Sequence, residues 1–108
     1  FAKRTSKDVI LQIDCGWAVA AGQDPVDLMK RHAGRARSVH FKPAVVKADE
    51  GKKKAILGQD AVDWPAVLKA CREVGGTEWI TIEQEAYPDG KSPMECSAAS
   101  LAGLKAIL

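Results

Sequence analysis

The chain has 108 residues, of which 46% are hydrophobic and 28% are charged, with a formal net charge of +2 at pH 7. These values are typical of a single globular domain, residues 1–108, and indicate neither a disordered chain nor a membrane span. The basic excess is small and no arginine stripe interleaves with aromatic residues, so we expect no nucleic-acid partner.

Three cysteines, Cys15, Cys71 and Cys96, are odd in number, widely spaced and free of any CxxC pair. This pattern favours reduced thiols in the cytoplasm over a disulfide framework or a zinc ribbon. The first residue is Phe1, and no basic-then-apolar leader precedes the first apolar run. We therefore expect a fragment, a trimmed chain or a processed product.

The first expected strand and helix follow a polar, basic lead-in at residues 1–8, whose charges we expect to lie in solvent. The apolar run from Val9 to Ile13 is rich in β-branched residues and predicts a buried strand. Asp14 then ends the run on the side where parallel sheets carry their ligand sites. Residues Trp17 to Gly22 suit one or two helical turns, which Gly22 can end in the left-handed conformation.

A second helix and strand are predicted between residues 24 and 43. Asp24 and Pro25 are typical of an N-cap and the first helical position, and the helix is expected to end at Gly34. The run from Ser38 to Lys42 predicts a strand, which Pro43 ends because proline donates no backbone hydrogen bond.

A long loop follows at residues 44–61 and is rich in lysine between Lys47 and Lys54. A loop of this length is usually a functional lid or a mobile, solvated excursion, and we favour the second interpretation. The lysines could meet a phosphate, but flexible lysines on a long loop more often serve solubility.

The third unit begins with a helix that Asp63 caps and that ends at Gly75-Gly76. Residues Glu78 to Glu83 then predict a strand. The segment Ser92–Glu95 forms a capping box with proline at the first helical position, and opens a final helix. The apolar face of that helix is expected to comprise Leu101, Leu104, Ile107 and Leu108. Strand and helix thus alternate three times, which predicts the α/β class, with three consecutive βα units on a parallel sheet.

Metal-competent side chains accompany all three strands: Asp14, His40 and Glu83. Neighbouring parallel strands lie about 4.8 Å apart, so side chains at the same edge of three strands can converge if the sheet curves. Two carboxylates and one imidazole suit Mn²⁺, Mg²⁺, Co²⁺ or Zn²⁺ better than a metal that prefers thiolates. The sequence therefore predicts a divalent-metal site.

Each of these residues also has a structural interpretation. Asp14 could cap the helical turn near Trp17, the commonest role of an aspartate between a strand and a helix. His40 could be a hydrogen-bonded core histidine. Glu83 could be a solvated loop residue or a partner for Lys42. Because all three stand on successive strands, we favour the metal interpretation over these alternatives.

Four stretches carry a family resemblance: Asp14–Ala18 with Ala21–Pro25, Gly34-Arg35 with Val39–Lys42, Ala61–Pro65, and Trp79–Glu85. With them, the chain resembles the C-terminal part of sugar phosphate isomerases/epimerases of the xylose isomerase-like barrel superfamily. The similarity extends over nearly all of residues 9–108. It implies a (β/α)₈ barrel, which takes roughly 250 residues when complete, of which this chain supplies strands six to eight.

The resemblance also implies a chemistry. Asp14, His40 and Glu83 match the family's metal ligands, and the metal stabilises the enediolate formed when a proton is removed next to a sugar carbonyl. Glu83 would be both ligand and acid/base, and Lys42 and Trp17 would line the site for a sugar or sugar phosphate. The family's fourth ligand, a glutamate on the fourth strand that is the opposing acid/base, would lie upstream of this chain. The resemblance therefore implies that this chain alone lacks the second proton donor of epimerisation, and we expect the chain by itself to be inactive as an epimerase.

Two functional hypotheses follow. The chain is the C-terminal fragment of a divalent-metal-dependent sugar (phosphate) isomerase/epimerase, or it is a non-catalytic partial-barrel module. Three strands leave two parallel edges unpaired and an inner face that lacks five strands. We therefore expect self-association into a homo-oligomer, or association with the missing part of the barrel.

Overall fold

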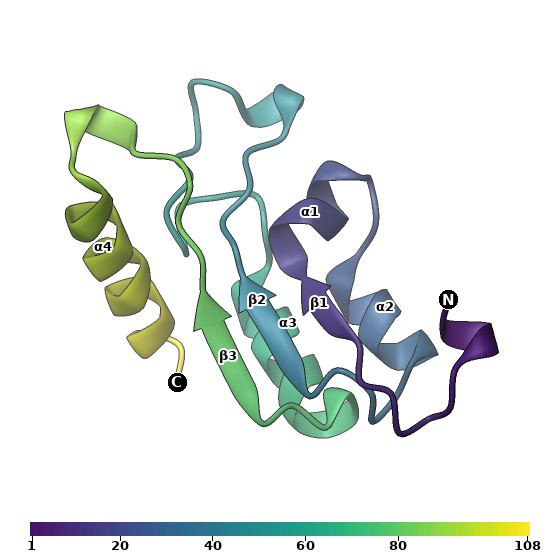
Figure 1. Cartoon of the computed structure of the whole chain (residues 1–108). Helices are drawn as coiled ribbons and strands as arrows, with labels where there is room; N and C mark the ends of the chain where they lie inside the picture. The colour runs from purple at the N-terminus through teal and green to yellow at the C-terminus, as the bar shows by residue number, and fades with distance from the viewer.

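A three-stranded parallel sheet forms the centre of the chain (Figure 1). The computed structural model describes all residues, 1–108, and the strands lie in the order β1-β2-β3. They are β1 (Gln12–Asp14), β2 (Ser38–Phe41) and β3 (Trp79–Ile82). Both neighbouring pairs are parallel, which confirms the predicted α/β class with three consecutive βα units.

Four helices accompany the strands: α1 (Cys15–Ala20), α2 (Pro25–Arg31), α3 (Trp64–Ala70) and α4 (Pro93–Lys105). A π-helical turn, Cys71–Gly75, extends α3. Each helix begins after a residue whose side chain accepts a hydrogen bond from a first-turn N–H group, namely Asp14, Asp24, Asp63 and Ser92. These caps satisfy N–H groups that would otherwise have no partner, and the predicted capping box at Ser92–Glu95 is confirmed.

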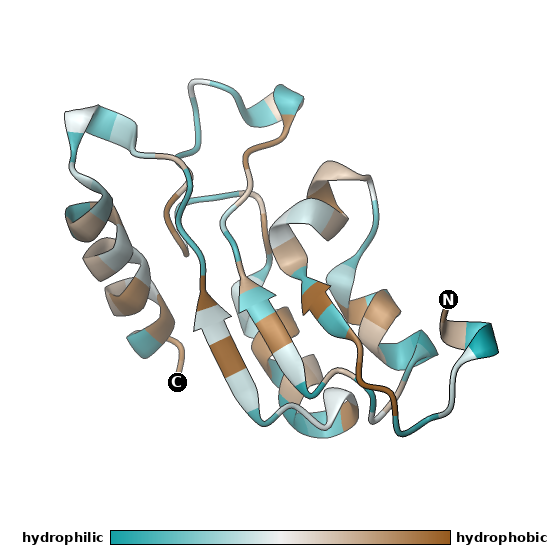
Figure 2. Ribbon diagram, viewed as in Figure 1, coloured by the Kyte–Doolittle hydropathy of each residue, from teal (hydrophilic) through white to brown (hydrophobic).

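The helices α2 and α3 cover one face of the sheet, and the hydrophobic core lies between them and the strands (Figure 1). Val39 and Phe41 of β2 are fully buried there, and the ring centroids of Phe41 and Trp64 lie 4.7 Å apart. Figure 2 shows hydrophobic and hydrophilic residues following one another along β2. Since side chains alternate along a strand, His40 faces away from this core.

The face that carries His40 is much more open. Ser38 and His40 are half-buried, and Trp79 at the start of β3 is 72% exposed. Neither β1 nor β3 has a strand on its outer edge. The sheet therefore has one open face and two unpaired edges.

The prediction of a strand over Val9–Ile13 is wrong at its start. Pairing begins only at Gln12, opposite Ser38, and Val9 is 40% exposed. Upstream of this register the main chain is held by Arg35, which is buried and donates from Nε to the carbonyl oxygen of Val9 at 2.9 Å. The apolar residues before Gln12 therefore have no sheet partner to bury them.

The predicted apolar face of α4 is also partly wrong. The buried positions are Cys96, Ser100 and Leu104, whereas Leu101 is 43% and Leu108 is 66% exposed. Small residues face inward because the backbone of the long loop comes close to this helix. A Cβ atom on Gly103 would lie only 2.1 Å from the carbonyl oxygen of Leu57.

The loop 44–61 is most exposed in its lysine-rich part. Residues 50–54 are exposed, but Ile56, Leu57 and Asp60 are buried. The carboxylate of Asp60 accepts hydrogen bonds from four groups: the backbone N–H of Ala44, Gly58 and Val62, and Nε1 of Trp64. The expectation of a solvated loop is therefore wrong for the half that packs under α4.

The three cysteines are unpaired and buried, in agreement with the sequence-based expectation of free thiols. None of the helices has the length and apolar character needed to cross a membrane.

Candidate metal site

Asp14, His40 and Glu83 converge at the carboxyl ends of the strands. Asp14 is the last residue of β1, it pairs in register with His40 of β2, and Glu83 directly follows β3. One nitrogen or oxygen atom from each of the three lies within 4.8 Å of the others. The structure thus brings together the three residues that the sequence singled out.

His40 stands between the two carboxylates. Its Nδ1 atom lies 2.6 Å from Oε2 of Glu83 and 3.9 Å from Oδ2 of Asp14. All three side chains are between 22% and 27% exposed, so the cluster is partly shielded but open to solutes. Such burial strengthens the attraction between charged groups relative to bulk water.

Asp14 serves two purposes with its two oxygens. Oδ1 accepts a hydrogen bond of 2.8 Å from the backbone N–H of Trp17 and so caps α1. Oδ2 is the atom that faces His40. The capping interpretation of Asp14 is therefore correct, and it leaves one carboxylate oxygen available at the site.

Lys42 lies next to the cluster and joins two carboxylates. Its Nζ is 3.1 Å from Oε1 of Glu83 and 2.5 Å from Oε2 of Glu85. The same ammonium lies 4.7 Å from the ring centroid of Trp17, a distance at which a cation–π attraction operates. The expected pairing of Glu83 with Lys42 is thus present together with the His40 contact, one on each oxygen.

These contacts fix the charge of the site at neutral pH. Hydrogen bonds from His40 and, second, from Lys42 hold the pKa of Glu83 below its ordinary value. Burial lowers the pKa of Lys42, but its hydrogen bonds to Glu85 and Glu83 outweigh this and raise it. Glu83 is therefore a carboxylate and Lys42 an ammonium across the neutral range.

Gly16 lets α1 approach the end of β2. A Cβ atom at this position would lie 2.6 Å from the carbonyl oxygen of Lys42 and 2.9 Å from its Cγ. Any larger residue would displace Lys42, so the glycine after Asp14 and Cys15 is part of what places the lysine.

No individual role was expected from the sequence for Glu85, Gln84 or Ser100. The Gln84 side chain donates to the carbonyl oxygen of Ala55 at 2.6 Å and accepts from Oγ of Ser100 at 2.7 Å. The same Oγ accepts from the N–H of Leu57 at 3.1 Å. This network ties the segment between the two glutamates to α4 and the long loop. The sequence contains one sign of this arrangement. Glu83 and Glu85 are two positions apart, and residues two apart in an extended segment face the same side, so Gln84 faces the opposite side.

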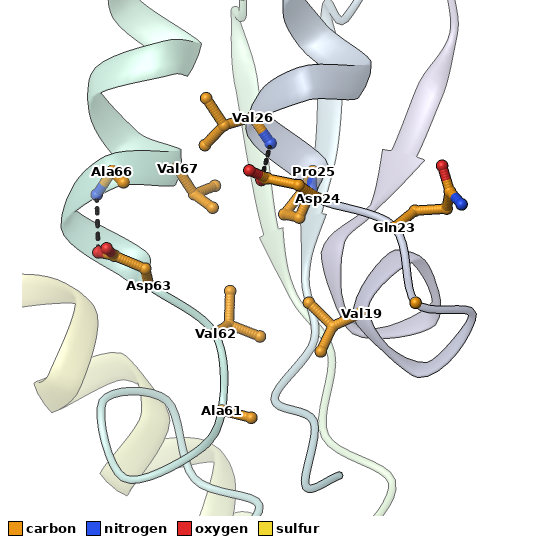
Figure 3. Close-up of a pocket in the computed structure, with 11 residues that line it drawn as sticks. Val19, Gln23, Asp24, Pro25, Val26, Ala61, Val62, Asp63, Ala66 and Val67 are labelled. Atoms are coloured by element: carbon orange, nitrogen blue, oxygen red, sulfur yellow. Dashed lines mark hydrogen bonds between the residues drawn. The ribbon is translucent and has the colours of Figure 1, made fainter.

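The largest hollow of the chain lies elsewhere, between the α1–α2 connection and the start of α3 (Figure 3). It measures about 490 Å³ and is lined mainly by apolar side chains. Its two carboxylates, Asp24 and Asp63, accept hydrogen bonds from the N–H groups of Val26 and Ala66, drawn as dashed lines. Each uses one oxygen as a helix cap, and no histidine or further carboxylate lines this hollow.

The donor set at the strand ends fits a divalent cation. It offers two carboxylate oxygens and one imidazole nitrogen, a combination suited to Mn²⁺, Mg²⁺, Co²⁺ or Zn²⁺. Two ligands at about 2.1 Å from an ion can be no more than about 4.2 Å apart, and the 3.9 Å between His40 and Asp14 meets this limit. His32, the other histidine, lies at the end of α2 and belongs to no such group.

The chain is similar to parts of several known proteins. No protein-family model matches the sequence. An inosose dehydratase from Clostridium botulinum is 28% identical over 101 residues, which are 81% of this chain and 34% of that protein. The rhizopine catabolism protein MocC from Rhizobium meliloti is 31% identical, over 83% of this chain and 32% of that protein.

Two solved structures also superpose on the chain. A sugar phosphate isomerase/epimerase from Parabacteroides distasonis superposes with a TM-score of 0.79 and 28% identity, over 96% of this chain and 33% of the other. A second one from the same organism has a TM-score of 0.75 and 22% identity, which supports the fold alone. The chain spans about a third of the length of these relatives.

Proposed function

Because the chain resembles sugar phosphate isomerases/epimerases of the xylose isomerase-like barrel superfamily over about a third of their length, we propose that it is part of a divalent-metal-dependent enzyme. Its reaction is the transfer of a proton on the carbon next to the carbonyl of a sugar, sugar phosphate or related polyol. The observation that carries the proposal is the convergence of Asp14, His40 and Glu83 within 4.8 Å.

In this proposal the three residues hold the metal. When bound, the ion supplies a Lewis acid that polarises the substrate carbonyl and so acidifies the neighbouring C–H bond. Nδ1 of His40 would hold the ion through its lone pair, and the proton that it shares with Glu83 would pass to solvent. Asp14 keeps its capping bond to Trp17 and binds through its other oxygen.

Glu83 is the proposed acid/base. Lys42 donates a hydrogen bond to Glu83 and favours its ionised form, so Glu83 can accept a proton. Lys42 steadies one of its oxygens and, with Trp17, lines the side from which a substrate approaches. A single base acts on only one face of the substrate. We therefore expect this chain to exchange the proton next to the carbonyl with solvent, but not to invert the configuration of that carbon.

The names of the relatives are consistent with one shared first step. One relative is named as a dehydratase of inosose, and another as an isomerase/epimerase of sugar phosphates. Both reactions can begin by removal of the proton next to the carbonyl. The proposed chemistry of Glu83 would therefore serve either outcome, and the rest of the enzyme would decide which occurs.

The experiment is deuterium exchange. The Mg²⁺-loaded chain is incubated with D-fructose in D₂O, and incorporation at the carbons next to the carbonyl is followed by mass spectrometry. We expect incorporation that is lost with EDTA and in Glu83→Gln, and retained in Glu78→Gln, an exposed glutamate at the other end of the strands. A metal-loaded chain that exchanges no proton would overturn the catalytic proposal.

The second candidate is a non-catalytic partial barrel that associates with another chain. The open outer edges of β1 and β3 and the exposed Trp79 favour it, since unpaired strands and exposed apolar surface promote association. The same association would also serve an active enzyme, through a second copy or the remaining barrel strands. As part of the proposal we place the protein in the cytoplasm, where three unpaired cysteines would stay reduced.

A further inference from the structure

The segment that follows β3 carries the proposed metal ligand Glu83 but has little support from the backbone. The N–H of Glu83 donates to the carbonyl oxygen of Phe41 at 3.2 Å. Beyond it, residues 84–87 make no backbone–backbone hydrogen bond. The direction in which the Glu83 carboxylate points therefore depends on side-chain contacts of its neighbours.

Gln84 supplies such a contact on the side of the segment that faces away from the metal site. Glu83 and Glu85 both contact Nζ of Lys42, so the two carboxylates face one side. The side chain of Gln84 faces the other side, where its Nε2 donates to the carbonyl oxygen of Ala55 at 2.6 Å. The segment is thus anchored on one side by Gln84 and presents both carboxylates on the opposite side.

Ser100 of α4 holds the amide of Gln84 in this orientation. Nε2 of Gln84 donates to two carbonyl oxygens, those of Ala55 and Ala86, each at 2.6 Å. Its Oε1 can only accept, and the hydroxyl of Ser100 donates to it at 2.7 Å. The same hydroxyl oxygen accepts from the N–H of Leu57 at 3.1 Å. Ser100 is completely buried, and alanine at this position would lose both bonds.

We infer that Ser100 is a positioning residue for the proposed metal site and acts through Gln84 on Glu83. The inference rests on the proposed function and adds to it a residue of α4, which contributes no metal ligand itself. Removal of a group that orients a metal ligand typically weakens metal binding by roughly 10–100-fold. Here the effect passes along one peptide unit, because Gln84 directly follows Glu83.

The alternative is that Ser100 only stabilises the packing of α4 on the long loop. Its bond to the N–H of Leu57 serves that packing and does not involve Gln84. A matched control is available on the same helix. The hydroxyl of Ser97 donates to the carbonyl oxygen of Pro93 at 2.9 Å, within α4 itself. Ser97→Ala therefore removes a helical serine hydroxyl without touching the segment that carries Glu83.

The first test is a double-mutant cycle on Mn²⁺ affinity, measured by calorimetry. Ser100→Ala should weaken binding by about tenfold or more, and Ser97→Ala should leave it unchanged. Gln84→Met keeps the length of the side chain but none of its hydrogen bonds, and should weaken binding by a similar factor. Adding Ser100→Ala to Gln84→Met should cause no further loss, because the two residues act as one unit.

Two results of this cycle would overturn the inference: wild-type affinity in either single variant, or two losses that simply add in the double variant. Gln84 is only half-buried, so Gln84→Met provides the test even if Ser100→Ala does not fold.

The second test needs no metal and follows hydrogen exchange by NMR. In Ser100→Ala we expect the N–H of Glu83 to exchange at least about tenfold faster than in the wild type. The N–H of Glu78, which donates to the carbonyl oxygen of Arg37 at 2.9 Å before the start of β3, should keep its rate. A purely structural role would accelerate both amides equally or neither, and either result would refute the inference.

The two tests separate this inference from the proposed function. Absence of Mn²⁺ binding by the wild type would count against the proposed function, and the exchange of the Glu83 N–H would then decide the role of Ser100 alone. Mn²⁺ binding by the wild type and by Ser100→Ala with equal affinity would refute the role of Ser100 while leaving the proposed function intact.

Discussion

The Nδ1 atom of His40 donates a 2.6 Å hydrogen bond to Oε2 of Glu83, joining β2 to the residue that follows β3. The bond spans 43 positions of sequence and exists only because two parallel strands end side by side. Backbone pairing supports it, since the N–H of Glu83 donates to the carbonyl oxygen of Phe41 at 3.2 Å. The sheet therefore places two of the three ligand candidates before any ion arrives.

The carboxylate of Asp60 is predicted to be essential for the fold of the long loop. Two of its hydrogen bonds come from Trp64 Nε1 at 2.6 Å and the N–H of Ala44 at 3.0 Å. Asp60→Asn would turn one oxygen into an N–H₂ donor that faces other donors. We expect the free energy of unfolding to fall by about 1–3 kcal/mol, measured by urea titration with tryptophan fluorescence.

Asp63→Asn is the matched control. Asp63 accepts from the N–H of Ala66 at 3.1 Å as an exposed helix cap, and asparagine caps helices as well as aspartate does. Its unfolding midpoint should match that of the wild type. Equal stabilities of Asp60→Asn and Asp63→Asn would contradict the role assigned to Asp60.

Gly103 is predicted to be required despite lying inside a helix. Alanine normally stabilises a helix interior by about 1 kcal/mol relative to glycine. Here the new Cβ would lie 2.1 Å from the carbonyl oxygen of Leu57, so Gly103→Ala should instead lower the unfolding free energy by about 1–3 kcal/mol. The control is Ala102→Gly, an exposed neighbour that reports helix propensity alone. Stabilisation by Gly103→Ala would show that the loop does not pack against α4 as described.

The cysteines are predicted to be unreactive in the folded chain. Burial raises the pKa of Cys15 and of Cys71, which keeps the thiols protonated and out of reach of solvent. At about pH 8.5 we expect iodoacetamide to modify the cysteines at least about a hundredfold more slowly than in urea, as followed by mass spectrometry.

The same shift has a consequence for stability. Because the thiol pKa values are higher in the folded chain than the ordinary 9.0, unfolded thiols ionise first as pH rises. The thiol contribution to stability is therefore complete below about pH 9 and is lost as pH increases above it.

For the iodoacetamide experiment, rapid modification of Cys15 in the native chain would show that this thiol is not buried.

Much of the site could be predicted because it depends on strand ends, which sequence patterns mark well. Asp14 and Glu83 each follow an apolar run, and a parallel sheet brings such residues to one edge. Helix starts were equally predictable, since Asp24 and Ser92 carry capping chemistry in the sequence itself.

Features set by distant packing could not be predicted. The start of β1 depends on where β2 begins, which the sequence near Val9 does not contain. The buried face of α4 depends on the approach of the loop at Leu57, which favours Ser100 and Gly103 over the leucines that periodicity selects. The pairing of Lys42 with Glu85 depends on a side-chain geometry that only the folded sheet defines.

Association is predicted from the open edges of the sheet. The outer edges of β1 and β3 are unpaired, and Trp79 is 72% exposed. Such edges and exposed apolar side chains favour pairing with another chain. Light scattering coupled to size exclusion should give a molar mass above the 11.6 kDa of one chain that rises with concentration. A monomer at every concentration would contradict this prediction.

The measurement that tests the account most directly is a calorimetric titration of Mn²⁺ into the metal-stripped chain. We expect saturable binding of one ion by the wild type and by His32→Ala, whose histidine lies outside the site. Binding should be lost in His40→Ala, because this variant removes the imidazole that faces Asp14 and Glu83. Absence of Mn²⁺ binding by the wild type, or equal binding by His40→Ala, would contradict the assignment of a metal site to these three strand ends.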